Sequence, residues 1–480
     1  MLFNSYVFIY FFLPVALAGF YILGRRKMYS WATLYLVAAS FFFYGYWDMR
    51  YVPLLFASIV FNYLVGRQLE KNLGNKTWLF FGIVVNVLLL GYFKYTDFFL
   101  STVNTVTGVD YFDLPHIVLP LGISFFTFTQ TAYLVDAYRG ETRNKSFLTY
   151  CEFVTIFPHL IAGPIISHRK MIPQFVAKET FSIRYDNFAK GLTLFSMGLF
   201  KKVVIADYLA PWVNGAFSHA GELSFLEAWI GALAYTFQLY FDFSGYSEMA
   251  IGLGLMLNLQ FPTNFNSPYK ATSIIDFWRR WHMTLGGWVK NYLYIPLGGN
   301  RHGELKKMRN LFVSMLIIGL WHGAGWTYVL WGGLHGLCLM INHQWRRLKC
   351  NLPESVNWAI TFLCVVICWV FFRAENISQA WDMLSTMINV GSLALPNDMF
   401  GGQYLKEIGM PLVVWHIDES LLTCTLVLLL LGILLVKVKN PLEWLENYHS
   451  NWRWLMVTII MLLFSLYRLN DYSEFLYFQF

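Results

Sequence analysis

Apolar runs with at most one charged residue recur along this chain, and the segments between them carry most of the charge. A helix that crosses a lipid bilayer needs about 20 apolar residues, so the shorter runs must include flanking aromatic residues to span it. The pattern predicts an all-α, polytopic membrane protein. The runs cover residues 6–24, 31–47, 51–65, 78–93, 117–135, 225–241, 245–259, 356–373, 420–436 and 454–467.

Composition supports this interpretation, because 57% of the 480 residues are hydrophobic and 13% are charged, against about 25% charged in ordinary soluble domains. Lipid must therefore cover much of the surface. The net charge of +7 would suit a polyanion, but the basic residues lie in short loops, which indicates topology signals and no nucleic-acid partner. Residues 1–24 have no basic start and no cleavage site, so run 6–24 is predicted to be a retained span.

The charged loops predict the orientation of the chain. The loop after the fourth run contains Asp97, Asp110 and Asp113 with Lys94 as its one cation, whereas the loops after the first, third and fifth runs are basic. Basic loops favour the cytoplasm, which places both ends of the chain and the acidic segment 374–419 outside. The basic loops contain Arg25, Arg26 and Lys27, then Arg67, Lys71 and Lys76, and then Arg139, Arg143 and Lys145.

Two less regular stretches, 150–213 and 273–345, lie between the runs, but no repeat or linker divides the chain. We therefore expect a single membrane domain over residues 1–480. Irregular backbone at membrane depth must be buried in protein or line a wet cavity. Residues 153–166 contain Pro158, Gly163 and Pro164, which predicts a re-entrant segment.

Charged residues inside the apolar stretches leave alternatives open. Lys201 and Lys202 need water, a ligand or a carboxylate such as Asp207, unless they extend to the interface from a helix that lies there. A polar cluster after run 225–241 serves either structural pairing or substrate contact. It comprises Gln238, Asp242, Ser244, Tyr246 and Glu248.

The stretch 311–345 is flanked by the basic segments 301–309 and 346–349, yet its 35 residues are too few for two crossings. We expect it to enter, break among its central glycines and return, with His322 on non-helical backbone. A titratable group there is a candidate functional residue, although a histidine packed in the core is the alternative. His335 lies 13 positions away, on a different helical face, and no H-x-x-x-H pair occurs, so no metal site is predicted.

Cations and tryptophans alternate upstream, in the stretch from Asp276 to Lys290. Arg279 and Arg280 follow Asp276 at helical i+3 and i+4 spacing, which makes an ion pair available. The stretch is either an interfacial anchor or a basic cytoplasmic mouth that holds the phosphates of a coenzyme. The candidate coenzyme-binding residues are Arg279, Arg280, Trp281 and Lys290. No G-x-S-x-G elbow or phosphate-binding P-loop occurs.

Several long, polar-rich motifs resemble the membrane-bound O-acyltransferase (MBOAT) family, in its bacterial branch of alginate and peptidoglycan O-acetyltransferases. The resemblance covers nearly the whole chain, with a core at about 117–373 and C-terminal spans and an aromatic tail at about 420–480. The motifs are LGYFKYTDFF at 90–99, IFPHLIAGPI at 156–165, LYFDFSGYSEMAIGLGL at 239–255, FWRRWHMTL at 277–285, YLYIPLGGNR at 292–301 and GLWHGAGWTYVLWGGLHG at 319–336.

The resemblance implies a ring of tilted and re-entrant helices, with cytoplasmic and exterior funnels that meet near a catalytic histidine. His322 matches that histidine and would act as general base, a role that suits the pKa of imidazole. His282 matches a second histidine that many relatives share. Acetyl-coenzyme A would be the donor, at a bacterial inner membrane. The acetyl group would pass through an SGNH-type periplasmic partner to a polysaccharide such as alginate, cellulose, another exopolysaccharide or peptidoglycan.

The C-terminal aromatic tail, residues 475–480, is either an interface belt or, as the resemblance implies, a relay in which Tyr477 accepts acetyl and passes it on. Gly286 and Gly287 depart from the family pattern, which leaves the donor's acyl length open. Broken helices with buried charge also suit a transporter, and an export scaffold for a surface polysaccharide is a further alternative. Transporters usually carry paired repeats, which this chain lacks.

Overall fold

The structure is a computed structural model that describes residues 1–142, 146–348, 352–397, 399, 411–469 and 476. Helices make up most of the chain. In the described part, one pair of two-residue strands, β1 (Leu395–Pro396) and β2 (Leu412–Val413), runs parallel. Among the described residues, four helical segments are long and apolar enough to cross a membrane. They are Phe8–Arg25, Met49–Lys71, Lys76–Thr107 and Glu354–Arg373.

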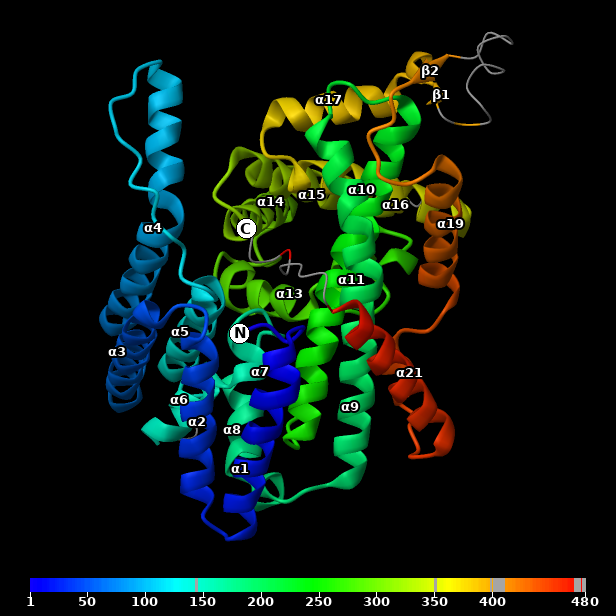
Figure 1. Cartoon of the computed structure of the whole chain (residues 1–480). Helices are drawn as coiled ribbons and strands as arrows, with labels where there is room; N and C mark the ends of the chain where they lie inside the picture. Colours follow the sequence, from blue (N-terminus) through cyan, green and yellow to red (C-terminus); the bar gives the residue numbers. More distant parts are fainter. Residues whose placement is uncertain (143–145, 349–351, 398, 400–410, 470–475, 477–480) are drawn as a thin grey trace.

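The helices of the first half of the chain form a group in which most neighbours are joined by short loops, whereas the longer connection at residues 108–122 joins α4 to α5 (Figure 1). A π-helical turn, η1 (Phe8–Phe12), leads directly into the first helix, which makes one continuous span. The helices are α1 (Leu13–Arg25), α2 (Tyr29–Gly45), α3 (Val52–Lys71), α4 (Lys76–Thr107), α5 (Ile123–Tyr138), α6 (Phe147–Thr155), α7 (Phe157–Leu160), α8 (His168–Val176), α9 (Tyr185–Phe200) and α10 (Asp207–Ser218).

The second half begins with the long helix α11, against which α9, α10, α16, α17 and α19 pack. Short helices cross the middle of the molecule, where Figure 1 shows α13 between the lower helices and the upper pair α14 and α15. The elements are α11 (Phe225–Met256), α12 (Ile274–Arg280), α13 (Met283–Val289), η6 (Lys290–Tyr294), α14 (Glu304–His322), α15 (Trp326–Arg347), α16 (Glu354–Arg373), α17 (Ile377–Ile388), α19 (Leu421–Lys437), α20 (Pro441–Leu445) and α21 (Trp452–Arg468).

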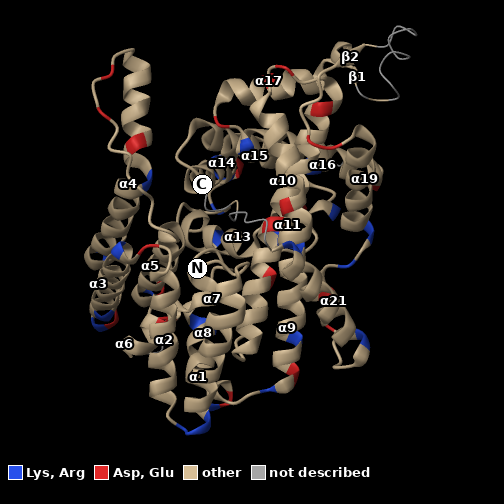
Figure 2. Ribbon diagram, viewed as in Figure 1, with Lys and Arg blue, Asp and Glu red and all other residues tan. Residues whose placement is uncertain are grey.

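Two sides of the molecule are defined by where its helices end. On the basic side, α1, α3 and α5 end at Arg25, Lys71 and Tyr138. On the opposite side, α1 and α5 begin and α2 ends. Figure 2 shows Lys and Arg in the loop below α1 and at the lower end of α3, and Asp and Glu beside the upper end of α4 and around α17.

Glycines bring α9 and α11 into direct backbone contact. A Cβ atom on Gly198 would lie 2.5 Å from the carbonyl oxygen of Gly245, and one on Gly252 would lie 2.6 Å from that of Gly191. Small residues of this kind let membrane helices approach closely and gain dispersion energy where no hydrophobic effect drives them together. The pair therefore forms a rigid centre around which the other helices are arranged.

The apolar runs locate the helices, but four predicted boundaries are wrong. The helix of run 51–65 continues to Lys71, so Arg67 and Lys71 lie within α3 and not in a loop. Runs 225–241 and 245–259 form one helix, α11, because the polar positions between them are paired inside the protein and do not break the backbone. The helix of run 78–93 continues to Thr107, so Lys94 and Asp97 lie within α4 and not in a loop. Run 117–135 becomes helical only at Ile123. The expected break near 153–166 is confirmed, since α6 and α7 are short and non-helical backbone follows.

Buried carboxylates pair with Lys201 and Lys202, which decides between the two interpretations of these lysines. Lys202 Nζ lies 2.7 Å from Asp207 Oδ1 and 2.8 Å from Asp242 Oδ1. Lys201 Nζ lies 2.6 Å from Glu248 Oε1. The predicted partner Asp207 is confirmed, and Asp242 and Glu248 serve structural pairing. Lys202 is 2% exposed, so it does not reach the interface.

Candidate functional site

The predicted break between residues 311 and 345 is present, and it is short. Helix α14 ends at His322, residues 323–325 are extended or bent, and α15 begins at Trp326. The expectation that His322 lies on non-helical backbone is wrong by one residue, because the glycines that permit the break follow the histidine. The two helices pack closely through Gly319 and Gly332, where any side chain would meet a backbone carbonyl of the partner helix.

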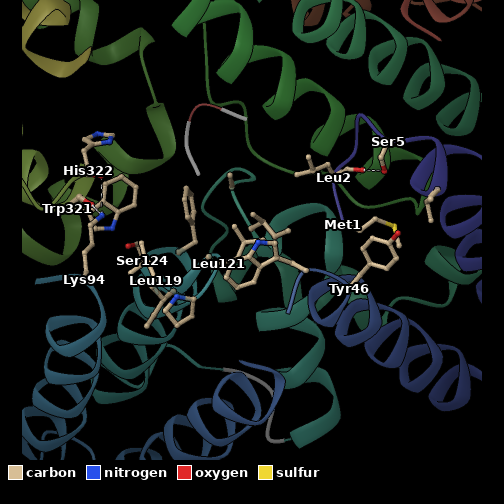
Figure 3. A pocket seen from close by; sticks show the side chains of 18 residues that line it. Met1, Leu2, Ser5, Tyr46, Lys94, Leu119, Leu121, Ser124, Trp321 and His322 are labelled. Atoms are coloured by element: carbon tan, nitrogen blue, oxygen red, sulfur yellow. Dashed lines mark hydrogen bonds between the residues drawn. The ribbon is translucent and has the colours of Figure 1, made fainter. Parts of the chain in front are cut away.

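Aromatic rings surround the His322 imidazole. The ring centroids of Trp321, Trp331 and Phe372 lie 4.9, 5.1 and 5.2 Å from its own. The residue is 4% exposed, and it lines a cavity of about 520 Å³. Figure 3 shows this cavity, which we call the opposite cavity. Its other lining residues include Met1, Tyr46, Lys94, Leu121 and Trp321. Since α1 and α5 begin there and α2 ends there, the cavity belongs to the opposite side.

A second cavity, of about 790 Å³, belongs to the basic side. Its lining residues Asn291 and Tyr292 contact the end of α5, where Arg139 donates to the Asn291 carbonyl and Tyr292 donates to Asp136. This basic cavity is also lined by Ser167, Lys170, Thr263, Met283, Thr284, Gly287 and Trp288.

Three stacked aromatic rings connect the walls of the two cavities. Trp321 lines the opposite cavity and Trp288 lines the basic cavity. Phe128 lies between them, with ring centroids 4.9 Å from Trp321 and 3.9 Å from Trp288 at interplanar angles of 13° and 5°. The Trp288 indole N–H donates to the Phe128 carbonyl at 3.1 Å, which fixes the stack. We call these three residues the aromatic wall.

His282 is buried behind the basic cavity, and Asn264 fixes its orientation. Its backbone is left-handed, with φ of 43°, which turns the chain from α12 into α13. The backbone N–H and the hydroxyl of Thr284 both donate to Asn264 Oδ1, which identifies this atom as the amide oxygen. His282 Nδ1 lies 2.9 Å from the same oxygen, so Nδ1 carries a proton and the lone pair of a neutral ring is on Nε2.

The two histidine rings lie close together, although only His322 lines a cavity. Their ring centroids lie 6.5 Å apart, and the Trp321 ring lies 6.2 Å from that of His282. His322 borders the opposite cavity directly, whereas Met283 and Thr284, which follow His282, line the basic cavity.

Comparison with known proteins adds to this geometry. A sequence model of the membrane-bound O-acyltransferase family matches residues 83–374. The chain belongs to this family. Its members are acyltransferases of the membrane, and membership favours the predicted enzyme over the transporter and scaffold alternatives.

Similar proteins include enzymes of bacterial cell-envelope polymers. The MBOAT chain is 43% identical to a peptidoglycan O-acetyltransferase of Helicobacter pylori, over 100% of this chain and 98% of that one. It is 46% identical to a probable alginate O-acetylase AlgI of Pseudomonas aeruginosa, over 82% of this chain and 76% of that one. A teichoic acid D-alanyltransferase of Bacillus subtilis is 26% identical, over 54% of this chain and 68% of that one.

The predicted coenzyme-binding residues of this MBOAT enzyme do not lie together. Arg280 pairs with Asp276 at 2.9 Å, as the spacing predicted. Arg279 lines a separate polar cavity of about 480 Å³, beside Arg346. The Trp281 side chain is buried and packs on Phe277 and Trp369, whereas Lys290 is exposed and precedes Asn291 in the basic cavity.

Sequence reasoning missed two residues of the site, Asn264 and Lys94. Asn264 lies between α11 and α12 with no motif of its own, and its role follows from contacts across 18 residues or more. Lys94 was expected in a loop, although the length of α4 could have been inferred from Gly108, whose left-handed backbone ends the helix. Tyr477 lies outside the described residues. Its neighbour Leu476 is buried, and its amide donates to Asp242 Oδ2 at 3.1 Å.

Proposed function

We propose that this enzyme transfers an acetyl group from acetyl-coenzyme A on the cytoplasmic, basic side to a hydroxyl acceptor on the opposite side, for O-acetylation of a cell-envelope polysaccharide. The observation that carries the proposal is the pair of cavities on opposite sides of one aromatic wall, where His322 lines one cavity and the residues that follow the buried His282 line the other. The relatives named for peptidoglycan and alginate acetylation support the substrate class. The basic loops support a cytoplasmic position for the basic side.

His322 is the proposed general base, because it borders the cavity through which an acceptor would enter. It removes the hydroxyl proton as the oxygen attacks the thioester carbonyl carbon, and it then gives this proton to the departing thiolate. General bases contribute about 10²–10⁴-fold to rate. His282 is assigned to the donor side, since Met283 and Thr284 line the basic cavity.

The coenzyme phosphates are anionic and require cations at the mouth of the basic cavity. Lys170 lines this cavity and Lys290 is exposed beside it, so we assign the phosphates to these two lysines. Arg279, with Arg346 in its own cavity, is the alternative assignment. Which pair holds the phosphates is decided by the KM for acetyl-coenzyme A in alanine variants of each.

The acetyl group is proposed to leave the opposite side through an SGNH-type periplasmic partner, with Tyr477 as a transient acceptor, at the inner membrane of a bacterium. Support comes from the neighbouring Leu476, which is held inside the protein by Asp242. Tyr477→Phe is expected to abolish polymer acetylation and to leave the binding of acetyl-coenzyme A unchanged. Wild-type acetylation in this variant would exclude the relay.

The decisive experiment measures transfer from radiolabelled acetyl-coenzyme A by the purified enzyme, together with mass spectrometry of surface glycans. We expect His322→Ala to lose transfer at unchanged protein level. His449→Ala, which removes an exposed histidine, is the matched control and is expected to retain it. Wild-type acetylation in the His322→Ala strain would refute the proposed function.

A further inference from the structure

Lys94 lies at membrane depth on α4 and reaches the end of the helix that carries His322. Its side chain is 8% exposed and lines the opposite cavity beside His322 (Figure 3). Lys94 Nζ donates to the carbonyl of Trp321 and, at 3.2 Å, to that of His322. The hydroxyl of the adjacent Tyr95 donates to the Leu320 carbonyl at 2.7 Å. These carbonyls belong to the last turn of α14, where no intrahelical donor is available.

The charge of Lys94 is compensated differently from that of the other lysines buried nearby. Lys201 and Lys202 each contact carboxylates. Lys94 belongs to none of the ion pairs in the part of the chain that the structure describes. Its partners are two neutral carbonyls at the negative end of a helix, which offsets about half an elementary charge. In its protonated form, Lys94 therefore leaves positive potential at the cavity wall next to His322.

An ammonium group has three N–H donors, and two of them bind the carbonyls of α14. Because Lys94 also lines the opposite cavity, the third N–H can donate to a group that binds in this cavity. Charge that develops on an oxygen during acyl transfer is stabilised by donors that are already in place, and the loss of one such donor costs about 10²–10³-fold in kcat.

We propose that Lys94 is a catalytic residue of the acyl transfer, the cation that binds the oxyanion, and this rests on the proposed function. The acceptor oxygen forms a bond to the thioester carbonyl carbon while His322 takes the hydroxyl proton. The carbonyl π electrons move to the carbonyl oxygen, which becomes an oxyanion bound by Lys94. The C=O bond then forms again, the C–S bond breaks, and the thiolate takes the proton from His322.

A purely structural role, in which Lys94 caps α14, makes a different prediction. A cap needs N–H donors but no charge, so Lys94→Gln would retain activity. An oxyanion site needs the cation, so Lys94→Gln and Lys94→Met would both lose kcat. Because the oxyanion exists only during the reaction, the KM for acetyl-coenzyme A is expected to change little.

The test measures kcat and KM of the purified full-length enzyme with acetyl-coenzyme A. We expect kcat to fall about 10²–10³-fold in Lys94→Gln and Lys94→Met, with Tyr92→Phe, an exposed position on the same helix, as the matched control. The decisive comparison uses one preparation of Lys94→Cys before and after alkylation with 2-bromoethylamine, which restores an ammonium group. Wild-type enzyme treated with the same reagent controls for the native cysteines.

Recovery of kcat on alkylation, together with loss in Lys94→Gln, supports the proposal. Wild-type kcat in Lys94→Gln, or a failure of alkylation to raise kcat while the protein keeps its melting temperature, overturns it. His322→Ala separates this result from the proposed function. If that variant turns over normally, the proposed function fails, whereas an inactive His322→Ala beside a fully active Lys94→Gln refutes the role of Lys94 alone.

Discussion

Removal of the Lys202 side-chain charge is expected to destabilise the protein strongly. Lys202→Met leaves the carboxylates of Asp207 and Asp242 buried without the ammonium that lies 2.7 and 2.8 Å from them. In an effective dielectric constant of about 20, each of these contacts is worth about 6 kcal/mol of Coulomb energy. Desolvation offsets most of this, and loss of one member of a buried ion pair costs about 3–5 kcal/mol.

A change of this size shifts the unfolding equilibrium by about 10²–10⁴-fold, which unfolding in SDS from detergent micelles can measure. Lys307→Met is the matched control, since its contact with Glu304 is 3.6 Å and partly exposed, so we expect a loss below about 1 kcal/mol. Neutralising both carboxylates in the Lys202→Met background, with Asp207→Asn and Asp242→Asn, should recover part of the stability. A Lys202→Met protein that unfolds with the wild-type midpoint would refute the reasoning.

Four further outcomes follow from the geometry. Gly198→Ala should cost about 1–3 kcal/mol because its Cβ meets a backbone oxygen of α11, whereas Gly287→Ala, with nothing within 4 Å, should leave the midpoint of SDS unfolding unchanged. Asn264→Leu removes the acceptor that holds His282 and should cost about 1–3 kcal/mol of transition-state stabilisation, which the ratio kcat/KM reports. Trp288→Ala should open the aromatic wall. The measurement is the release of trapped coenzyme A from liposomes that contain the variant. Lys290→Ala should raise the KM for acetyl-coenzyme A and leave kcat unchanged. A KM equal to that of the wild-type enzyme would contradict this assignment.

The sequence predicted the helices well where burial and hydrophobicity coincide. Uncharged runs located α1, α2, α3 and α16, because a lipid environment tolerates few other sequences. Helix α11 was divided in two, since Asp242 interrupts the apolar sequence and its partner Lys202, in the π-helical segment Lys201–Ala206, is known only from the fold. A hydropathy profile describes the polarity of each residue, but it does not show which residue of opposite charge lies beside it in the fold.

The site was predicted unevenly for a related reason. His322 could be singled out from its own neighbours, the glycines that end a helix at membrane depth. His282 entered through its resemblance to a family motif. Lys94 and Asn264 could not be assigned from local sequence, because their roles depend on contacts that are 228 and 18 residues distant along the chain. The proposed roles of these residues rest on their proximity to the histidines in the fold, which a single sequence does not record.

The aromatic wall of Phe128, Trp288 and Trp321 also separates the two cavities against the passage of ions. The stacked rings lie between the walls of two cavities that belong to opposite sides of the protein. A cell membrane normally maintains ion gradients, so a water path between the cavities would be costly. Flat rings in van der Waals contact leave no chain of water along which protons could hop. Under the proposed function, the wall would let substrates approach from both sides of the membrane without opening a path for ions between them.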